Sequence, residues 1–166
     1  MTVSQIILGI DPGYGRCGFG LIRTLCQSSG GNGSDVEVVD YGVSTTEAGV
    51  EIGARLSEVA RDIEELLNRH KPDLVAIEKI FFTTNAKTAM GVAEARGAIL
   101  LVCARAGVRV VELTPGQVKS AVTGNGQADK RAVEEMVLRL TGMKKSPKLD
   151  DASDALAIAI TAIGLA

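Results

Sequence analysis

Four carboxylates lie at the ends of strongly apolar stretches, where acidic side chains are rare unless they bind or react with something. They are Asp11, Glu78, Asp151 and Asp154. Two carboxylates about 4 Å apart repel by about 4 kcal/mol at an effective dielectric of about 20, so a fold that brings several together must supply protons or a cation. Oxygen ligands alone favour a hard divalent cation, Mg²⁺ or Mn²⁺. Pairs of such ions stabilise the attacking and leaving oxygens of phosphodiester displacement, so the pattern predicts metal-dependent phosphoryl chemistry.

Two of these carboxylates end predicted strands. Ile6–Ile10 is apolar apart from one glycine and rich in β-branched residues, which predicts a strand buried on both faces, and Asp11 follows it directly. The Asp-Pro-Gly sequence that begins at Asp11 is also a turn signature, so a turn alone could account for this residue. Leu74–Glu78 is a second apolar strand that ends in its carboxylate, and no turn sequence follows it. Glu78 is therefore predicted to be functional even without the other carboxylates.

The other two carboxylates open the last predicted helix. Either Asp150 or Asp151 could act simply as a helix cap. Asp154 lies inside the helix, just ahead of the apolar run Ala155–Ile160 that must be buried, so capping does not explain it. A spacing of three or four residues puts Asp154 on one helix face with either partner.

The net charge of −2 conceals a strong asymmetry along the chain. Asp35–Glu78 has eleven acidic and four basic residues, a balance of −7, whereas Thr114–Lys148 has seven basic and three acidic residues, a balance of +4. Within the basic segment, Lys119 lies on a short predicted helix capped by Thr114. Lys130 and Arg131 lie in the first turn of a helix that begins at Asp129, where cations oppose the helix dipole unless they serve an anionic ligand. Carboxylates combined with a basic segment indicate a nuclease.

The remaining pattern predicts the elements that position these groups. Further strands are expected at Cys17–Thr24, Val36–Val43 and Val108–Leu113, and long helices at Val50–Arg69 and Asn85–Ala106. The short links between the first three strands favour antiparallel hairpins. The helix at Asn85–Ala106 is crowded with alanine and glycine, which permits close packing either on the sheet or against a second copy of the same helix.

Composition predicts one domain spanning residues 1–166, since a chain of this length can bury a sizeable core. The three cysteines are scattered, without metal-ligand spacing, which suggests a reducing cytoplasm. No signal peptide is recognisable, and the apolar run Leu156–Ala166 is too short to span a membrane.

The ordered motifs resemble those of the RuvC family of bacterial Holliday junction resolvases, from about residue 5 to residue 164. The motifs that carry the resemblance are Gly9–Gly13, Ala76–Glu78 with Phe81 three residues on, Gln117–Lys119, Gly124–Gly126 with Lys130, and Asp151–Ile160. A single motif of this kind would be weak, whereas the complete set in this order is highly specific. The stretch Ser28–Asp35 looks longer than is usual in the family, and the chain ends close to its last helix.

The resemblance implies an α/β, RNase H-like fold whose five-stranded mixed sheet has three antiparallel strands and then two parallel ones, flanked by helices. It implies a homodimer that cuts two opposed strands of a four-way DNA junction, with Mg²⁺ on Asp11, Glu78, Asp151 and Asp154. Lys119 and Lys130 match functional basic positions, and Phe81 matches an aromatic residue that contacts DNA near the junction. The implied partner is the RuvA–RuvB branch-migration complex.

Two other classes of protein share parts of this pattern. Actin-like ATPases also open with a strand that ends in Asp-x-Gly, but they need a second domain of similar size to close over ATP. A non-catalytic RNase H-like scaffold has no reason to keep four carboxylates and two lysines together. Cutting of a synthetic four-way junction, compared with linear duplex and with ATP hydrolysis, distinguishes the three.

Overall fold

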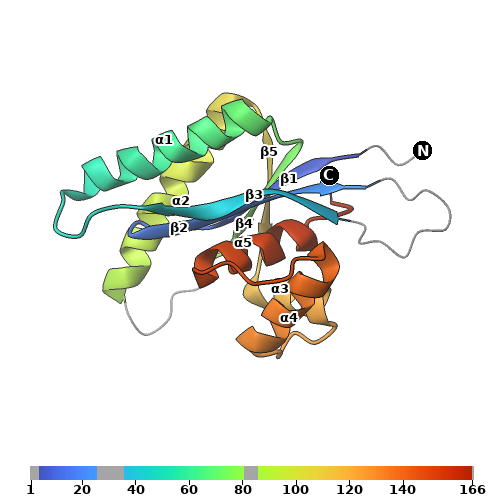
Figure 1. The fold of residues 1–166 in the computed structure, drawn as a ribbon. Coiled ribbons are helices and arrows are strands. Elements are labelled where there is room, and N and C mark those ends of the chain that lie inside the picture. Colours follow the sequence, from blue (N-terminus) through green and yellow to red (C-terminus); the bar gives the residue numbers. More distant parts are fainter. Residues whose placement is uncertain (1–3, 26–35, 81–85, 166) are drawn as a thin grey trace.

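The computed structural model describes residues 4–25, 36–80 and 86–165, and within it five strands form one sheet. The strands are β1 (Ile6–Asp11), β2 (Arg16–Thr24), β3 (Val36–Thr45), β4 (Leu74–Glu78) and β5 (Arg109–Leu113). Their order across the sheet is β3-β2-β1-β4-β5 (Figure 1). β1, β2 and β3 pair antiparallel, whereas β4 runs parallel to both β1 and β5. The predicted mixed sheet is therefore confirmed, with β1 at its centre.

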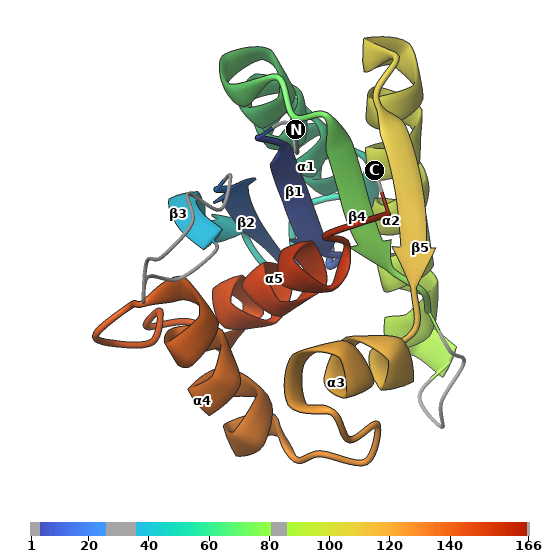
Figure 2. The same ribbon diagram turned by 90° about the vertical axis from the view of Figure 1, so that its right-hand side faces the viewer.

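In the described part of the chain, five helices cover the two faces of this sheet. They are α1 (Ile52–His70), α2 (Ala86–Ala106), α3 (Pro115–Thr123), α4 (Lys130–Thr141) and α5 (Asp150–Thr161). α1 and α2 lie on one face, and α3, α4 and α5 gather on the other (Figure 2). Among the helices in these ranges, none combines the length and the apolarity that crossing a bilayer requires.

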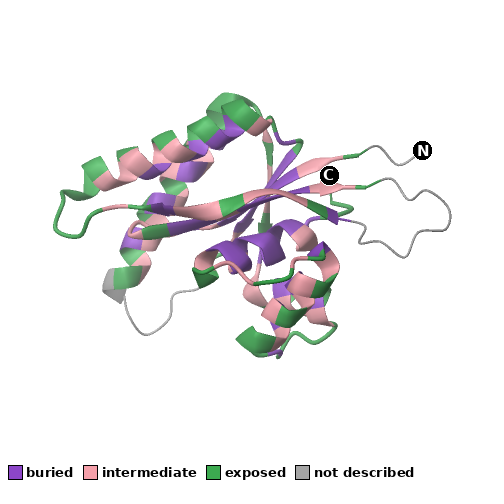
Figure 3. Ribbon diagram, viewed as in Figure 1, coloured by how far each residue is buried: buried purple, intermediate pink, exposed green. Residues whose placement is uncertain are grey.

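Each face of the sheet has its own hydrophobic core because side chains alternate along a strand. On β1, Ile7 packs towards α5, whereas Leu8 and Ile10 pack towards α1 and α2. The strand is enclosed on both sides, as its apolar sequence predicts. Figure 3 shows the burial concentrated in the centre of the sheet and in α5, with the outer surface of α1 exposed.

α5 lies directly on the sheet because glycines remove the side chains beneath it. Gly9 of β1 pairs with Gly20 of β2, and Asp11 pairs with Gly18. A Cβ atom at Gly9 would lie 2.1 Å from the carbonyl oxygen of Ala155, and one at Gly18 would lie 2.1 Å from that of Asp151. The two helix carbonyls therefore occupy space that side chains would fill at other positions. This close approach brings the start of α5 to the end of β1 that carries Asp11.

The starts of α3 and α4 agree with the capping signals in the sequence. Thr114 caps α3 in a capping box with Gln117, and the Asp129 side chain caps α4 by accepting a hydrogen bond from the Ala132 amide. The structure moves the predicted ends by one or two residues, since α1 begins at Ile52 and β3 continues to Thr45.

Small residues of α2 serve packing within the chain. Ala95 and Cys103 are fully buried, and Cys103 belongs to the core that α1 and α2 form with the sheet. Cys17 is also buried, and both thiols are free. Met90 and Leu101, in contrast, are exposed on α2 by 65% and 53%. Packing on the sheet therefore explains part of the helix and leaves an apolar outer surface.

Candidate active site

The central pair of parallel strands delivers two carboxylates to the same edge of the sheet. Ile10 of β1 pairs with Ile77 of β4, and Asp11 and Glu78 occupy the next position on each strand. Ile10 and Ile77 both pack towards α1 and α2. Because successive side chains point to opposite faces, Asp11 and Glu78 both face α5. The sheet register thus brings together two residues that are 67 positions apart.

The N-terminal turn of α5 supplies the other two carboxylates. Asp151 lies over Gly18, which is the direct partner of Asp11 in the sheet. Asp154 lines a cleft together with Glu78. Leu149 is the N-cap residue of α5 and makes no side-chain hydrogen bond to the helix. Neither Asp150 nor Asp151 is therefore the N-cap that the sequence allowed. The structure therefore brings all four predicted carboxylates to one place.

The ionisation of these groups reflects where they lie. Burial, followed by the charges of Glu78, Asp154 and Asp151, raises the pKa of Asp11 from 3.8 to about 7. Lys130 acts in the opposite direction but does not offset them. Asp11 is therefore protonated below neutral pH, and about half protonated near pH 7, unless a cation replaces the proton.

The neighbouring carboxylates respond in the same direction. Burial, followed by the charge of Asp154, raises the pKa of Glu78, and Lys119 lowers it in part. Burial also raises the pKa of Asp154, although Lys130 opposes this rise. The site thus carries more negative charge than its own lysines neutralise, which is the condition under which a metal ion is favoured.

Two side chains that the sequence interpretation did not assign to the site, Arg16 and Asp150, complete the charge distribution. Arg16 Nε lies 3.2 Å from Asp151 Oδ2, and Lys130 Nζ lies 2.7 Å from Asp150 Oδ2 and 3.2 Å from Asp154 Oδ2. The short β1–β2 link starts β2 at the same edge of the sheet where β1 ends, so the position of Arg16, five residues after Asp11, was detectable from this link alone.

A cleft of about 270 Å³ opens beside the carboxylates. Glu78, Asp154, Lys119 and Lys130 line its charged part. Its apolar part comes from Pro115, Val118, Val133, Ala157 and Ile158, contributed by α3, α4 and α5. Carboxylates and ammonium groups therefore face one another across a space open to solvent, an arrangement suited to a metal ion and a phosphate.

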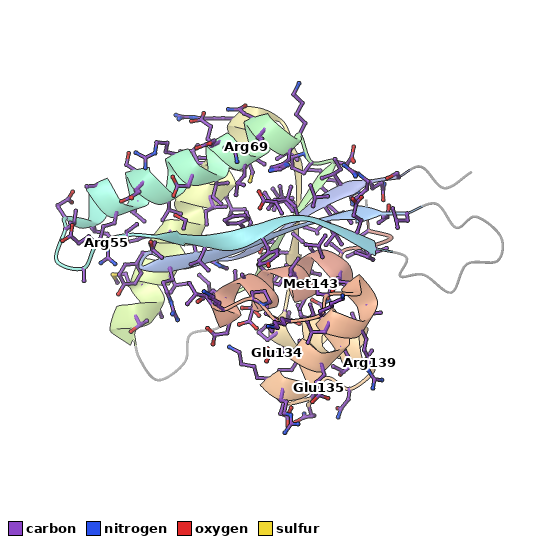
Figure 4. All side chains as sticks on the ribbon, viewed as in Figure 1. Arg55, Arg69, Glu134, Glu135, Arg139 and Met143 are labelled. Carbon is purple, nitrogen blue, oxygen red and sulfur yellow. The ribbon has the colours of Figure 1, made fainter. Side chains whose placement is uncertain are left out.

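The turn after β1 is fixed by α1 and α2. The Arg55 guanidinium, labelled on α1 in Figure 4, lies over the Tyr14 ring at 4.7 Å from its centroid, and Arg55 Nε donates to Thr46 Oγ1. Gly91 of α2 faces the other part of this ring, where a Cβ would come within 2.5 Å. These contacts hold the loop that follows Asp11.

The carboxylate oxygens suit a hard cation, although they are not gathered into a complete coordination shell. Among the residues in ranges 4–25, 36–80 and 86–165, no three Asp, Glu, His or Cys side chains are gathered as a finished metal site. Asp151 Oδ2 is buried without a hydrogen-bond donor aligned to it, despite the nearby guanidinium of Arg16. A divalent cation would give this carboxylate oxygen a partner. It would also offset the burial and the neighbouring charges that raise the pKa of Asp11.

Two predicted DNA-binding residues are not part of this cluster. Arg131 is 86% exposed and pairs with Glu135 along α4, where Figure 4 labels that glutamate. Phe81 lies outside the described residues, as does the stretch Ser28–Asp35. Lys119 and Lys130, by contrast, both line the cleft.

A mixed five-stranded sheet with helices on both faces and carboxylates at the ends of its central strands defines an RNase H-like protein. The family model described as crossover junction endodeoxyribonuclease RuvC matches residues 7–162. The chain therefore belongs to the RuvC family, as the sequence motifs predict.

Relatives and solved structures agree over nearly the whole chain. The RuvC proteins of Syntrophomonas wolfei and Gloeobacter violaceus are 46% and 48% identical to it, in each case over 93% of this chain and 86% of the relative. The structure of T. thermophilus RuvC in complex with a Holliday junction substrate is 33% identical and superposes with a TM-score of 0.85, covering 96% of this chain and 93% of that one.

Proposed function

We propose that this protein is a Holliday junction resolvase, a Mg²⁺-dependent endonuclease that makes paired, symmetric nicks in opposed strands of four-way DNA junctions during recombination and repair. The observation that carries the proposal is the meeting of carboxylates from β1, β4 and α5 beside a lysine-lined cleft. Membership of the RuvC family and likeness to a relative solved with a Holliday junction substrate support the choice of DNA substrate.

Asp11, Glu78, Asp151 and Asp154 would hold the Mg²⁺, for which Mn²⁺ can substitute. When bound, the metal supplies Lewis-acid activation of the phosphodiester and of the attacking water. The carboxylates fix the site against the end of the sheet. Asp11, which pairs with Gly18 of β2, would release its proton to solvent when a metal ion binds.

Lys119 and Lys130 would contact DNA phosphates on either side of the cleft. Arg131, exposed at the start of α4, would reach a phosphate further along the same strand or arm. Phe81 is proposed to contact bases near the junction on the strength of the family motif alone.

Paired cutting is most simply achieved by a two-fold symmetric homodimer, because the junction presents two equivalent strands. The exposed Met90 and Leu101 of α2 are 11 positions apart, which is about three helical turns, so they share one face. This apolar face supports α2 as the dimer surface. The proposal extends to one nuclease domain spanning residues 1–166, to action in the cytoplasm, and to the RuvA–RuvB complex as partner.

A cleavage assay on a synthetic four-way junction tests the proposal. The protein with Mg²⁺ should cut opposed strands of the junction at matching positions, leave a linear duplex of the same sequence intact and hydrolyse no ATP. Junction binding without cutting in Mg²⁺ or Mn²⁺ would favour a non-catalytic scaffold. ATP hydrolysis without cutting would favour an actin-like ATPase.

A further inference from the structure

Cations and carboxylates alternate along the N-terminal turn of α5. The Arg16 guanidinium lies 3.2 Å from Asp151 Oδ2 and 4.0 Å from Asp150 Oδ1. Lys130 Nζ lies 2.7 Å from Asp150 Oδ2 and 3.2 Å from Asp154 Oδ2. Asp150 is therefore shared by both cations, and each cation also touches one carboxylate of the proposed metal site.

Asp150 differs from its neighbours in exposure. Its side chain is 56% exposed, against 19% for Asp151 and 39% for Asp154. It therefore lies outside the cleft that Asp154 lines. Lys130 is nevertheless closer to Asp150 than to Asp154, so the exposed carboxylate draws the ammonium group outwards.

This arrangement resolves a conflict between two demands on the same residues. A divalent cation needs the oxygens of Asp151 and Asp154, which Arg16 and Lys130 otherwise neutralise. A DNA phosphate needs those two cations close to the metal but not bound to its ligands. A third carboxylate at the rim eases this conflict for Lys130, because Asp150 makes the shorter contact with the ammonium group that Asp154 would otherwise bind alone.

We propose that Asp150 is a positioning residue, which draws Lys130 towards the rim of the site so that Asp154 remains available to a divalent cation. This inference rests on the proposed function for the identity of the metal and of the DNA. When Asp150 is removed, Lys130 settles on Asp154 alone. It then competes with the metal for this ligand.

A double-mutant cycle separates this role from simple loss of one negative charge. Mn²⁺ binding, followed by electron paramagnetic resonance without DNA, is compared in the wild type, Asp150→Asn, Lys130→Gln and the double variant. We expect Asp150→Asn to weaken Mn²⁺ binding more in the wild type than in the Lys130→Gln background, by a factor of about three or more. Equal losses in the two backgrounds, or no loss in either, would overturn the proposal.

Matched variants control for the fold and for general charge. Asp150→Glu keeps a carboxylate within reach of both cations and should restore wild-type Mn²⁺ affinity. Glu135→Gln removes an acid of α4 that pairs with Arg131 instead, and should leave the affinity nearly unchanged. If Asp150→Asn melts early through loss of helix-dipole stabilisation, Asp150→Ser keeps a hydrogen-bonding group at this helix end and replaces it in the cycle.

The readout also keeps this inference separate from the proposed function. Metal binding is measured without DNA, so absence of junction cleavage in the wild type would refute the resolvase proposal and leave the cycle readable. Normal cleavage together with an additive cycle would refute only the role of Asp150.

Discussion

Asp11 and Glu78 occupy matching positions on adjacent parallel strands, one residue beyond the Ile10–Ile77 pair, and both face α5. Their separation is therefore set by the strand spacing of the sheet, not by a loop. A site built on two central strands is rigid, which favours a fixed geometry for metal ligands. Loss of either carboxylate should impair chemistry without disturbing the fold.

We predict that Asp11→Asn, Glu78→Gln and Asp154→Asn each abolish cleavage while junction binding is largely retained. Metal ions contribute several kcal/mol of transition-state stabilisation, and each 1.36 kcal/mol is tenfold in rate, so the loss should reach about 10³-fold or more. Affinity comes instead from phosphate contacts. Cleavage and gel-shift assays on the same preparations check this, and parallel loss of binding would mean that these residues hold the fold.

The raised pKa of Asp11 predicts an unusual pH dependence of stability. The folded protein keeps the proton on Asp11 up to about pH 7, whereas the unfolded chain releases it near pH 3.8. Because the folded state then binds more protons, the free energy of unfolding of the metal-free protein falls as pH rises between these values, by at most about 4 kcal/mol. Urea unfolding in EDTA at pH 5 and pH 8 measures the part of this fall above pH 5, about 3 kcal/mol at most.

Two comparisons identify Asp11 as its source. Asp11→Asn should be more stable than the wild type at pH 8 without metal and should show a weaker pH dependence. Mg²⁺ should stabilise the wild type at pH 8 and the variant much less, because the ligand charge is missing. Identical pH dependence in both proteins would show that Asp11 is not held protonated by the fold.

Gly18→Ala tests whether contact between α5 and the sheet positions Asp151. A Cβ at Gly18 would lie 2.1 Å from the Asp151 carbonyl oxygen, so the helix must shift. We expect destabilisation of about 1–3 kcal/mol and weaker Mn²⁺ binding. Gly116→Ala is the control, since its Cβ would meet only Thr114 Oγ1 at 4.0 Å and alanine favours the helix. Normal Mn²⁺ affinity in a folded Gly18→Ala protein would contradict this account.

Lys119→Ala should reduce cleavage and flatten the salt dependence of junction binding by about one unit of slope at most. Lys119 lines the cleft, so a phosphate there would release one counterion. Arg109→Ala, at the opposite end of β4 and β5, is the control and should leave both quantities unchanged. Binding titrations between about 50 and 200 mM salt measure the slope. An unchanged slope and rate for Lys119→Ala would make it an ordinary surface lysine.

Charges on the outer face of α2 should shift the protein from dimer to monomer. Met90→Glu and Leu101→Glu place a carboxylate in the proposed interface, whereas Ser57→Glu adds the same charge to the exposed surface of α1. Light scattering should detect monomers only for the α2 variants, and paired cutting should fall before single nicking. Ala89→Glu and Ala93→Glu test neighbouring half-buried positions. A series that stays dimeric would move the interface elsewhere.

The sequence alone predicted the helices and strands and singled out the four carboxylates. Apolar runs that end abruptly in an acid, such as those before Asp11 and Glu78, are local patterns, and local patterns predict strands and their ends well. Caps were equally readable, since Thr114 and Asp129 act on amides only three residues away. The ordered motifs then indicated the family that the comparisons confirm.

How these groups meet, and which cations lie beside them, follows from the tertiary fold and not from local sequence. The register between β1 and β4 depends on packing across the sheet, which no local pattern fixes. Contact between α5 and Gly18 depends on a missing side chain in a distant strand. The ion pairs of Asp150 with Arg16 and Lys130 join three elements, so Asp150 reads as a helix cap in the sequence and as a shared carboxylate in the fold.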